Sequence, residues 1–155
     1  MVAVSPQTLN PMSTNGPFDD PSLLLAVPCN LSRALFLITS ADTHPLVVPR
    51  VQARLAQQFG SDEAAGQAWS AHWFREGLVA YEAQLEPGCT RCHGEALSIA
   101  DLALASHLIG VERFGVDLTE FPRTAAVGES LFALPEFAAA HPRLQLGAPG
   151  LGLPG

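Results

Sequence analysis

The sequence predicts an all-α fold. Apolar residues recur every three or four positions through most of the chain, glycines and prolines separate these stretches, and no stretch alternates polar with apolar residues. The chain has 155 residues, of which 48% are hydrophobic, and a mean hydropathy of +0.21. That is enough apolar material for the core of one globular domain.

The charge pattern excludes several functions. The net charge is −7, and all eight basic residues are arginines. Without lysine the chain has no Schiff-base catalysis and no phosphate-loop lysine, and without a basic stripe we expect no nucleic-acid or membrane partner. The first basic residue is Arg33, which does not fit a secretory signal, and no apolar run is long enough for a membrane span. Three cysteines are too few for a disulfide scaffold, so the sequence predicts a cytoplasmic location.

Three regions follow from the composition. Residues 1–28 are expected to form an irregular arm because five prolines interrupt them, residues 29–145 a helical domain, and residues 146–155 a flexible tail rich in glycine and proline.

The first helical pattern runs from Leu31 to Leu55, with Asn30 or Ser32 as its N-cap. Pro45 and Pro49 lie inside this pattern, so we expect a kink or a junction of two helices near His44. Gly60 is expected to end it.

A second helix is expected to open at Ser61 or Asp62 and to stop at Glu86-Pro87-Gly88. Its predicted buried stripe consists of Ala65, Trp69, Trp73, Leu78, Tyr81 and Leu85.

The strongest helix start lies at Ser98. Ser98 and Asp101 have the spacing of a capping box, and Leu97 and Leu102 that of a hydrophobic staple. This third helix should run to about Arg113. Pro122 starts another helix at its first position, and a short one follows from Pro135 to His141. The helix after Pro122 carries the apolar residues Ala126, Val127, Leu131 and Phe132.

Cys89-Thr90-Arg91-Cys92-His93 matches the C-x-x-C-H signature of covalent haem attachment. Zinc bound through Cys89, Cys92, His93 and a distant ligand such as His107 is a second interpretation, although the sequence contains no second pair of ligands. The interpretation we favour is a partly exposed loop in which two thiols lie near each other.

The other chemical candidates are single residues. The histidines and carboxylates are scattered, so no catalytic triad or carboxylate pair follows from their spacing, and the catalytic residues stay unknown. His72, between two tryptophans, is expected to pack or to lie at the surface. Arg113 near a helix C-terminus either complements the helix dipole or holds a substrate carboxylate.

Several segments in order along residues 23 to 149 resemble the C-terminal helical domain of zeta-class glutathione transferases, the maleylacetoacetate isomerases. No single segment is specific to that family, but the collinear set is. The matching segments are His44-Pro45-Leu46, the Trp69 to Leu85 helix, Cys92-His93-Gly94, Leu97 to Leu102, Glu112 to Leu118, Leu134 to Phe137, and His141-Pro142.

The resemblance implies a glutathione transferase C-terminal-like helical bundle and a glutathione-dependent cis–trans isomerisation of maleylacetoacetate to fumarylacetoacetate, in tyrosine and phenylalanine breakdown. Glutathione would be the co-substrate, with no metal and no haem, since family members carry Cys-His-Gly in this loop without haem. By the same resemblance His44 lies beside glutathione, Arg113 holds a substrate carboxylate, and Ser98 with Asp101 caps a central helix.

The departures from the family pattern concern the glutathione side. The family's amino-terminal thioredoxin-like domain, which activates the thiol, is largely missing, so the resemblance implies a truncated chain that is impaired alone, with the arm as a possible remnant. Val47, Val48 and the pair Ser106-His107 replace polar or Pro-Gln positions of the family. A non-catalytic helical interaction module is the alternative function. A homodimer, or association through an exposed apolar face, is the expected assembly.

Overall fold

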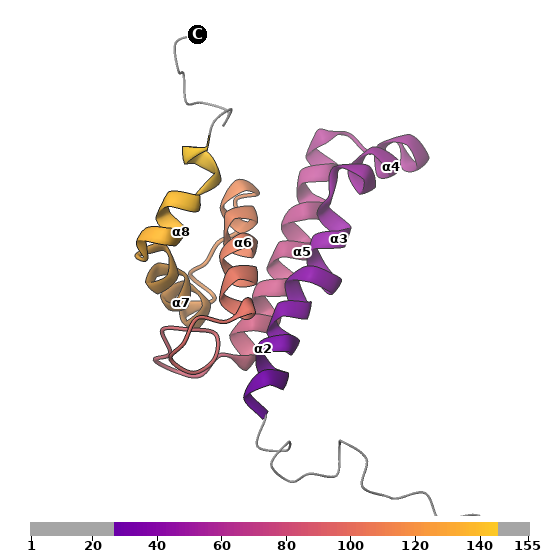
Figure 1. Cartoon of the computed structure of the whole chain (residues 1–155). Helices are drawn as coiled ribbons and strands as arrows, with labels where there is room; N and C mark the ends of the chain where they lie inside the picture. The colour runs from indigo at the N-terminus through magenta and orange to yellow at the C-terminus, as the bar shows by residue number, and fades with distance from the viewer. Residues whose placement is uncertain (1–26, 146–155) are drawn as a thin grey trace, which may run out of the picture.

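The computed structural model describes residues 27–145, and within them no residue forms a β-strand. The predicted all-α fold is confirmed (Figure 1). The elements in chain order are α2 (Val27–Leu37), the π-helical turn η1 (Ile38–Thr43), α3 (His44–Val47), α4 (Pro49–Phe59), α5 (Glu63–Gln84), α6 (Ile99–Arg113), α7 (Pro122–Phe132), α8 (Pro135–Ala140) and the 3₁₀ turn η2 (Pro142–Leu144). Residues 1–26 of the predicted arm and the whole predicted tail lie outside the described residues.

The first helical region breaks near His44, as predicted, and its prolines explain why. Pro45 lies in the first turn of α3 and Pro49 in the first turn of α4, where a missing N–H costs no helical hydrogen bond. Val48 between them is extended, the conformation that a following proline favours. The predicted N-caps were wrong, because α2 begins at Val27 and therefore contains both Asn30 and Ser32.

Helix α5 begins and ends where the sequence indicates. Gly60 ends α4 with a φ of 68°, a left-handed conformation that suits glycine, and Oδ1 of Asp62 accepts a hydrogen bond from the Ala65 amide at 2.8 Å. The predicted buried stripe is correct only in the C-terminal half of the helix. Ala65 is exposed, and Ser70 in the N-terminal half and Phe74 at the middle of the helix are buried instead.

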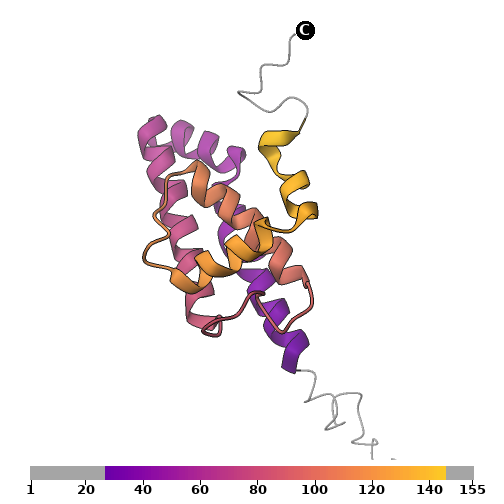
Figure 2. The ribbon, with the colours of Figure 1, turned by 90° about the vertical axis from the view of Figure 1, so that its left-hand side faces the viewer.

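Helix α6 is the central helix of the domain, in contact with α2, α5 and α7 (Figures 1 and 2). Three of its residues, Ala100, Leu104 and Val111, are at most 1% exposed, and together with Leu78 and Tyr81 of α5 they form the middle of the hydrophobic core. Leu97 and Leu102, the expected hydrophobic staple at its start, are both more than half exposed.

Helix α7 begins at Pro122, as predicted, and is capped by a residue of α5. The Glu82 carboxylate accepts hydrogen bonds from the Arg123 amide at 3.0 Å and the Thr124 amide at 2.9 Å. Of the four apolar residues named for this helix, Val127 and Leu131 are buried, whereas Ala126 is exposed and Phe132 half-buried. None of the helices within residues 27–145 combines the length and apolar character that crossing a membrane requires.

Candidate functional site

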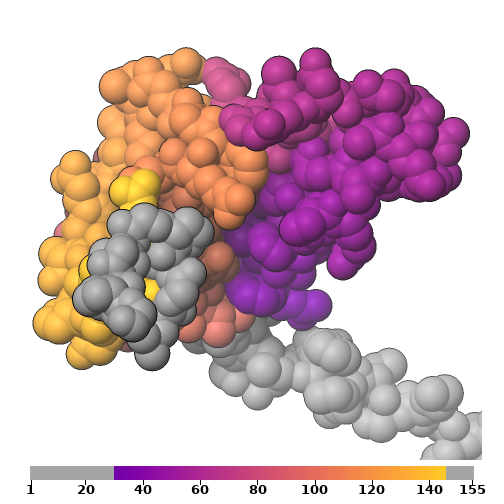
Figure 3. Space-filling view, turned by 90° about the horizontal axis from the view of Figure 1, so that it is seen from above, coloured from indigo at the N-terminus to yellow at the C-terminus, as the bar shows by residue number. Residues whose placement is uncertain are grey.

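A cleft of about 720 Å³ opens between α3 and α4 on one side and α5 and α6 on the other. Seen from above, the segment containing α2 to α4 and the segment containing α6 and α7 lie on opposite sides of the molecule (Figure 3). The cleft forms because Pro45 and Pro49 redirect the chain after α2, which sets α4 at an angle to α5. The polar residues that line it are His44, Gln52, Ser61, Asp62, Glu63, Gln67, Ser70, Ser106 and Arg113.

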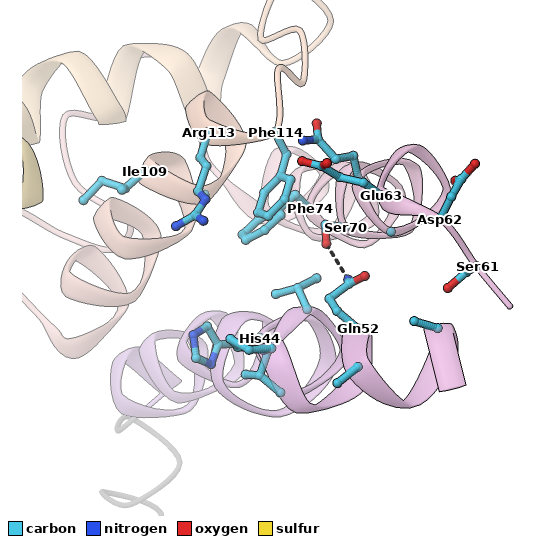
Figure 4. Close-up of a pocket in the computed structure, with 18 of the residues that line it drawn as sticks. His44, Gln52, Ser61, Asp62, Glu63, Ser70, Phe74, Ile109, Arg113 and Phe114 are labelled. Carbon is cyan, nitrogen blue, oxygen red and sulfur yellow. Dashed lines mark hydrogen bonds between the residues drawn. The ribbon is translucent and has the colours of Figure 1, made fainter. Parts of the chain in front are cut away.

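His44 and Arg113 line this same cleft, although they lie on different helices and far apart in the sequence. His44 begins α3 and Arg113 ends α6, and both side chains are exposed (Figure 4). None of the ion pairs between described residues involves Arg113, so its guanidinium is available to bind an external anion. The structure thus brings together the two residues that the resemblance assigns to glutathione and substrate.

Two aromatic rings cover the middle of the cleft. Phe74 of α5 and Phe114, which follows α6, stack with their centroids 5.4 Å apart (Figure 4). Gly110 allows this packing, because a Cβ on Gly110 would collide with the Phe74 ring. The cleft therefore combines a cationic end with an apolar middle, an arrangement suited to a carboxylate with an unsaturated or aliphatic body.

The sequence did not predict the polar wall formed by Gln52 and Ser70. Gln52 Nε2 donates a hydrogen bond to Ser70 Oγ at 2.8 Å, and Ser70 is completely buried. In the sequence, Gln52 and Ser70 are simply polar residues that follow the predicted apolar positions Val51 and Trp69. Neither shows that α4 and α5 meet at this point.

A buried polar network lies behind the cleft. His107 is 1% exposed, its Nε2 donates to the Phe74 carbonyl at 2.9 Å, and its Nδ1 lies 3.4 Å from the Thr43 hydroxyl. The pKa of His107 is lowered to about 4, mainly by burial. The hydrogen bond to the Phe74 carbonyl acts in the opposite direction, and nearby His44 adds to the lowering. His107 is therefore neutral at pH 7 and holds α6 to α5.

The cysteine loop gives no metal site within the described residues. Cys92 is 3% exposed and belongs to the hydrophobic core, whereas Cys89 is half-buried. Burial raises the pKa of both thiols, and for Cys92 the nearby Asp101 carboxylate adds to the effect. Residues 27–145 contain no group of three or more histidine, cysteine or acidic side chains placed to hold a metal ion, so His107 does not join Cys89, Cys92 and His93 as the zinc interpretation requires.

Ser98 and Asp101 form a capping box at the start of α6. Oδ2 of the fully buried Asp101 accepts from both the amide and the hydroxyl of Ser98, each at 2.8 Å. Oδ1 accepts from the Cys92 amide at 2.8 Å. Asp101 therefore ties the cysteine loop to the central helix as well as capping it.

Comparison with models of known protein families found no match. The sequence is similar to maleylacetoacetate isomerase of Pseudomonas aeruginosa, with 35% identity over 134 residues, which cover 85% of this chain and 62% of the relative.

Two solved structures are similar in both sequence and fold. Maleylacetoacetate isomerase of Methylobacterium extorquens AM1, with bound malonate and glutathione, has a TM-score of 0.74 and 36% identity over 77% of this chain and 57% of its own. The holo structure of a bacterial maleylpyruvate isomerase, a zeta-class glutathione transferase, has a TM-score of 0.72 and 36% identity over 76% of this chain and 57% of its own. The chain therefore spans about three fifths of the length of each of these three relatives.

Proposed function

We propose that this chain provides the substrate site of a glutathione-dependent cis–trans isomerase, as a helical domain like the C-terminal one of zeta-class glutathione transferases. The proposed substrate is maleylacetoacetate, which is converted to fumarylacetoacetate. The observation that carries the proposal is the meeting of Arg113 and His44 in one cleft with an apolar middle.

Arg113 binds and orients the substrate in this proposal. Its guanidinium donates paired hydrogen bonds to the carboxylate next to the cis double bond. The rings of Phe74 and Phe114 cover the alkene and exclude water from it. A relative that binds malonate and glutathione together supports a carboxylate site beside a glutathione site.

His44 and Ser106 form the side of the cleft proposed to face glutathione. Both are exposed, and both also line a smaller groove between α2, η1 and α6, so their hydrogen-bonding groups fit a peptide-like ligand. Bound glutathione supplies a thiol that adds reversibly to the double bond, which allows rotation about a single bond before elimination restores the alkene. Among the described residues that line the cleft there is no cysteine, so we assign the thiol to the co-substrate.

Turnover of maleylacetone by the purified chain tests this function. We expect slow isomerisation that requires glutathione, as for the impaired chain that the resemblance implies, and a fall in kcat/KM of about 10- to 100-fold in Arg113→Ala from loss of a charge-assisted pair. Arg54→Ala is the control, because Arg54 is exposed on α4 and does not line the cleft. No turnover, together with no glutathione binding by calorimetry, would refute the isomerase function and favour a non-catalytic interaction module.

Assembly and location are further parts of the proposal. We expect self-association through the exposed apolar residues at the start of α6. The expected cytoplasmic location rests on the low cysteine content of the sequence.

A further inference from the structure

The wall of the cleft formed by α4 and the start of α5 is polar at one point. Gln52 is half-buried and lines the cleft, with its Nε2 held by the Ser70 hydroxyl at 2.8 Å. Ser70 lines the cleft as well but is 0% exposed, so Gln52 is the more accessible of the two. The part of Ser70 is to fix the orientation of the Gln52 carboxamide.

The Gln52 carboxamide lies against the backbone of α5. A Cβ placed on Gly66 would lie 2.6 Å from Gln52 Oε1, so this glycine lets the side chain pack close to the helix. Ser70 uses one of the two Nε2 hydrogens, and no described residue accepts a hydrogen bond from the second. An oriented carboxamide with a free donor is thus built into the wall (Figure 4).

The surrounding charges select the ligand group that can use this donor. Asp62, the N-cap of α5, and Glu63 in its first turn line one end of the cleft, whereas Arg113 and His44 line the other (Figure 4). A second carboxylate next to Gln52 would be repelled by these two acids. An uncharged acceptor, such as a ketone oxygen, would not.

We propose that Gln52, positioned by Ser70, determines specificity by donating a hydrogen bond to a ketone oxygen of a ligand whose carboxylate is bound at Arg113. This inference rests on the proposed function, whose substrate is an oxo acid, and adds the residue of this chain that recognises a ketone oxygen. Gln52 contacts the ligand, and Ser70 acts as a positioning residue.

The test compares linear oxo acids, with the ketone at successive positions, with alkanoates of the same length and charge. Binding to the whole isotope-labelled chain is followed by nuclear magnetic resonance, which observes the Gln52 side-chain amide directly. We expect at least one oxo acid to bind about 3- to 10-fold more tightly than its alkanoate and to shift the Gln52 amide signal. Gln52→Leu should abolish this preference and Ser70→Ala should reduce it.

The controls separate this inference from the proposed function. Gln57→Leu, on the same helix but outside the cleft lining, should keep the oxo-acid preference. Arg113→Ala should weaken both acids of a pair equally. Equal binding of each oxo acid and its alkanoate, no binding of either, or a preference that survives Gln52→Leu would overturn the inference, and the glutathione-dependent turnover would still decide the proposed function.

Discussion

At the scale of single residues, Asp101 links the cysteine loop to the start of helix α6. It is fully buried, and its carboxylate accepts hydrogen bonds from the Ser98 amide, the Ser98 hydroxyl and the Cys92 amide. The sequence predicted the bond within the capping box, because it depends only on local spacing. The bond to Cys92 depends on how the loop folds back, which local spacing does not specify.

Asp101→Ala should lower the free energy of unfolding by about 2 to 4 kcal/mol, since it removes a helix cap and leaves buried N–H groups without an acceptor. Urea denaturation measures the change. Asp117→Ala is the control, because Asp117 also accepts local hydrogen bonds, from the Thr119 amide and hydroxyl, but in an exposed turn. Equal midpoints for Asp101→Ala and the parent chain would contradict the assigned role.

His107 should make the stability depend on pH. Its pKa is about 4 in the folded chain against an ordinary value of 6.5, so its contribution is complete above pH 6.5. Below that, the unfolded chain takes up a proton that the folded chain does not, and stability falls by roughly 3 kcal/mol as the pH passes through the folded pKa.

His107→Gln should flatten the stability profile between pH 7 and 4 relative to the parent chain, as measured by urea denaturation at a series of pH values. Glutamine keeps a donor for the Phe74 carbonyl but does not titrate. His72→Gln, at an exposed histidine of α5, is the matched control and should leave the slope unchanged. A parent profile that His107→Gln does not alter would show that His107 does not titrate in this range.

At the scale of elements, the helix boundaries were the most predictable feature. Pro49, Gly60, Asp62 and Pro122 act through their own backbone or through a neighbour three residues away, so the sequence alone indicates them. The π-helical turn η1 was not predictable. Its buried threonines contact residues of distant helices, because Thr39 Oγ1 lies 2.9 Å from the Tyr81 hydroxyl and Thr43 Oγ1 lies 3.4 Å from His107 Nδ1.

The candidate site was predictable only in part. Arg113 and His44 came from a family resemblance, and the cleft that joins them depends on the angle between α4 and α5. Gln52 and Ser70 were missed because their hydrogen bond joins two helices, and neither residue type indicates burial or function by itself. In α5 the helical period was correct, but the face toward the core shifts along the helix.

Helix α7 depends on α5 for its cap. The Glu82 carboxylate accepts from the Arg123 amide, the Thr124 amide and the Thr124 hydroxyl, and although burial raises the Glu82 pKa, these bonds and the charge of Arg123 lower it overall. The stabilisation is therefore present above the ordinary pKa of glutamate and is lost as the pH falls through the lowered value.

Glu82→Ala should reduce stability by about 1 to 2 kcal/mol through loss of the cap. Hydrogen exchange should show faster exchange of the Arg123 and Thr124 amides, which lose their acceptor. Glu129→Ala, at an exposed position of α7, provides the comparison. Unchanged protection of both amides in Glu82→Ala would rule out the cap.

At the scale of the whole molecule, apolar side chains remain exposed around the start of the central helix. Leu97, Ile99 and Leu102 are 53%, 51% and 60% exposed, and Leu102 and Phe36 line the small groove between α2 and α6. Ile99 and Leu102 lie one turn apart on α6, so they share a face. A surface of this kind favours contact with another protein surface.

Self-association of the chain should follow from this surface. Light scattering over a range of concentrations should show a mass above that of the monomer, and Leu102→Gln should lower it. Leu144→Gln, at a leucine that is 64% exposed elsewhere, should not. A monomeric mass at every concentration would contradict the expected association.

Binding of maleylacetone at Arg113 tests the account most directly. In a nuclear magnetic resonance titration of the isotope-labelled chain, the side-chain N–H signal of Arg113 should shift until it saturates. The Kd should rise about 10-fold or more in Arg113→Ala but stay the same in Arg54→Ala. An equal Kd in the parent chain and in Arg113→Ala would contradict the carboxylate site on which the proposed function rests.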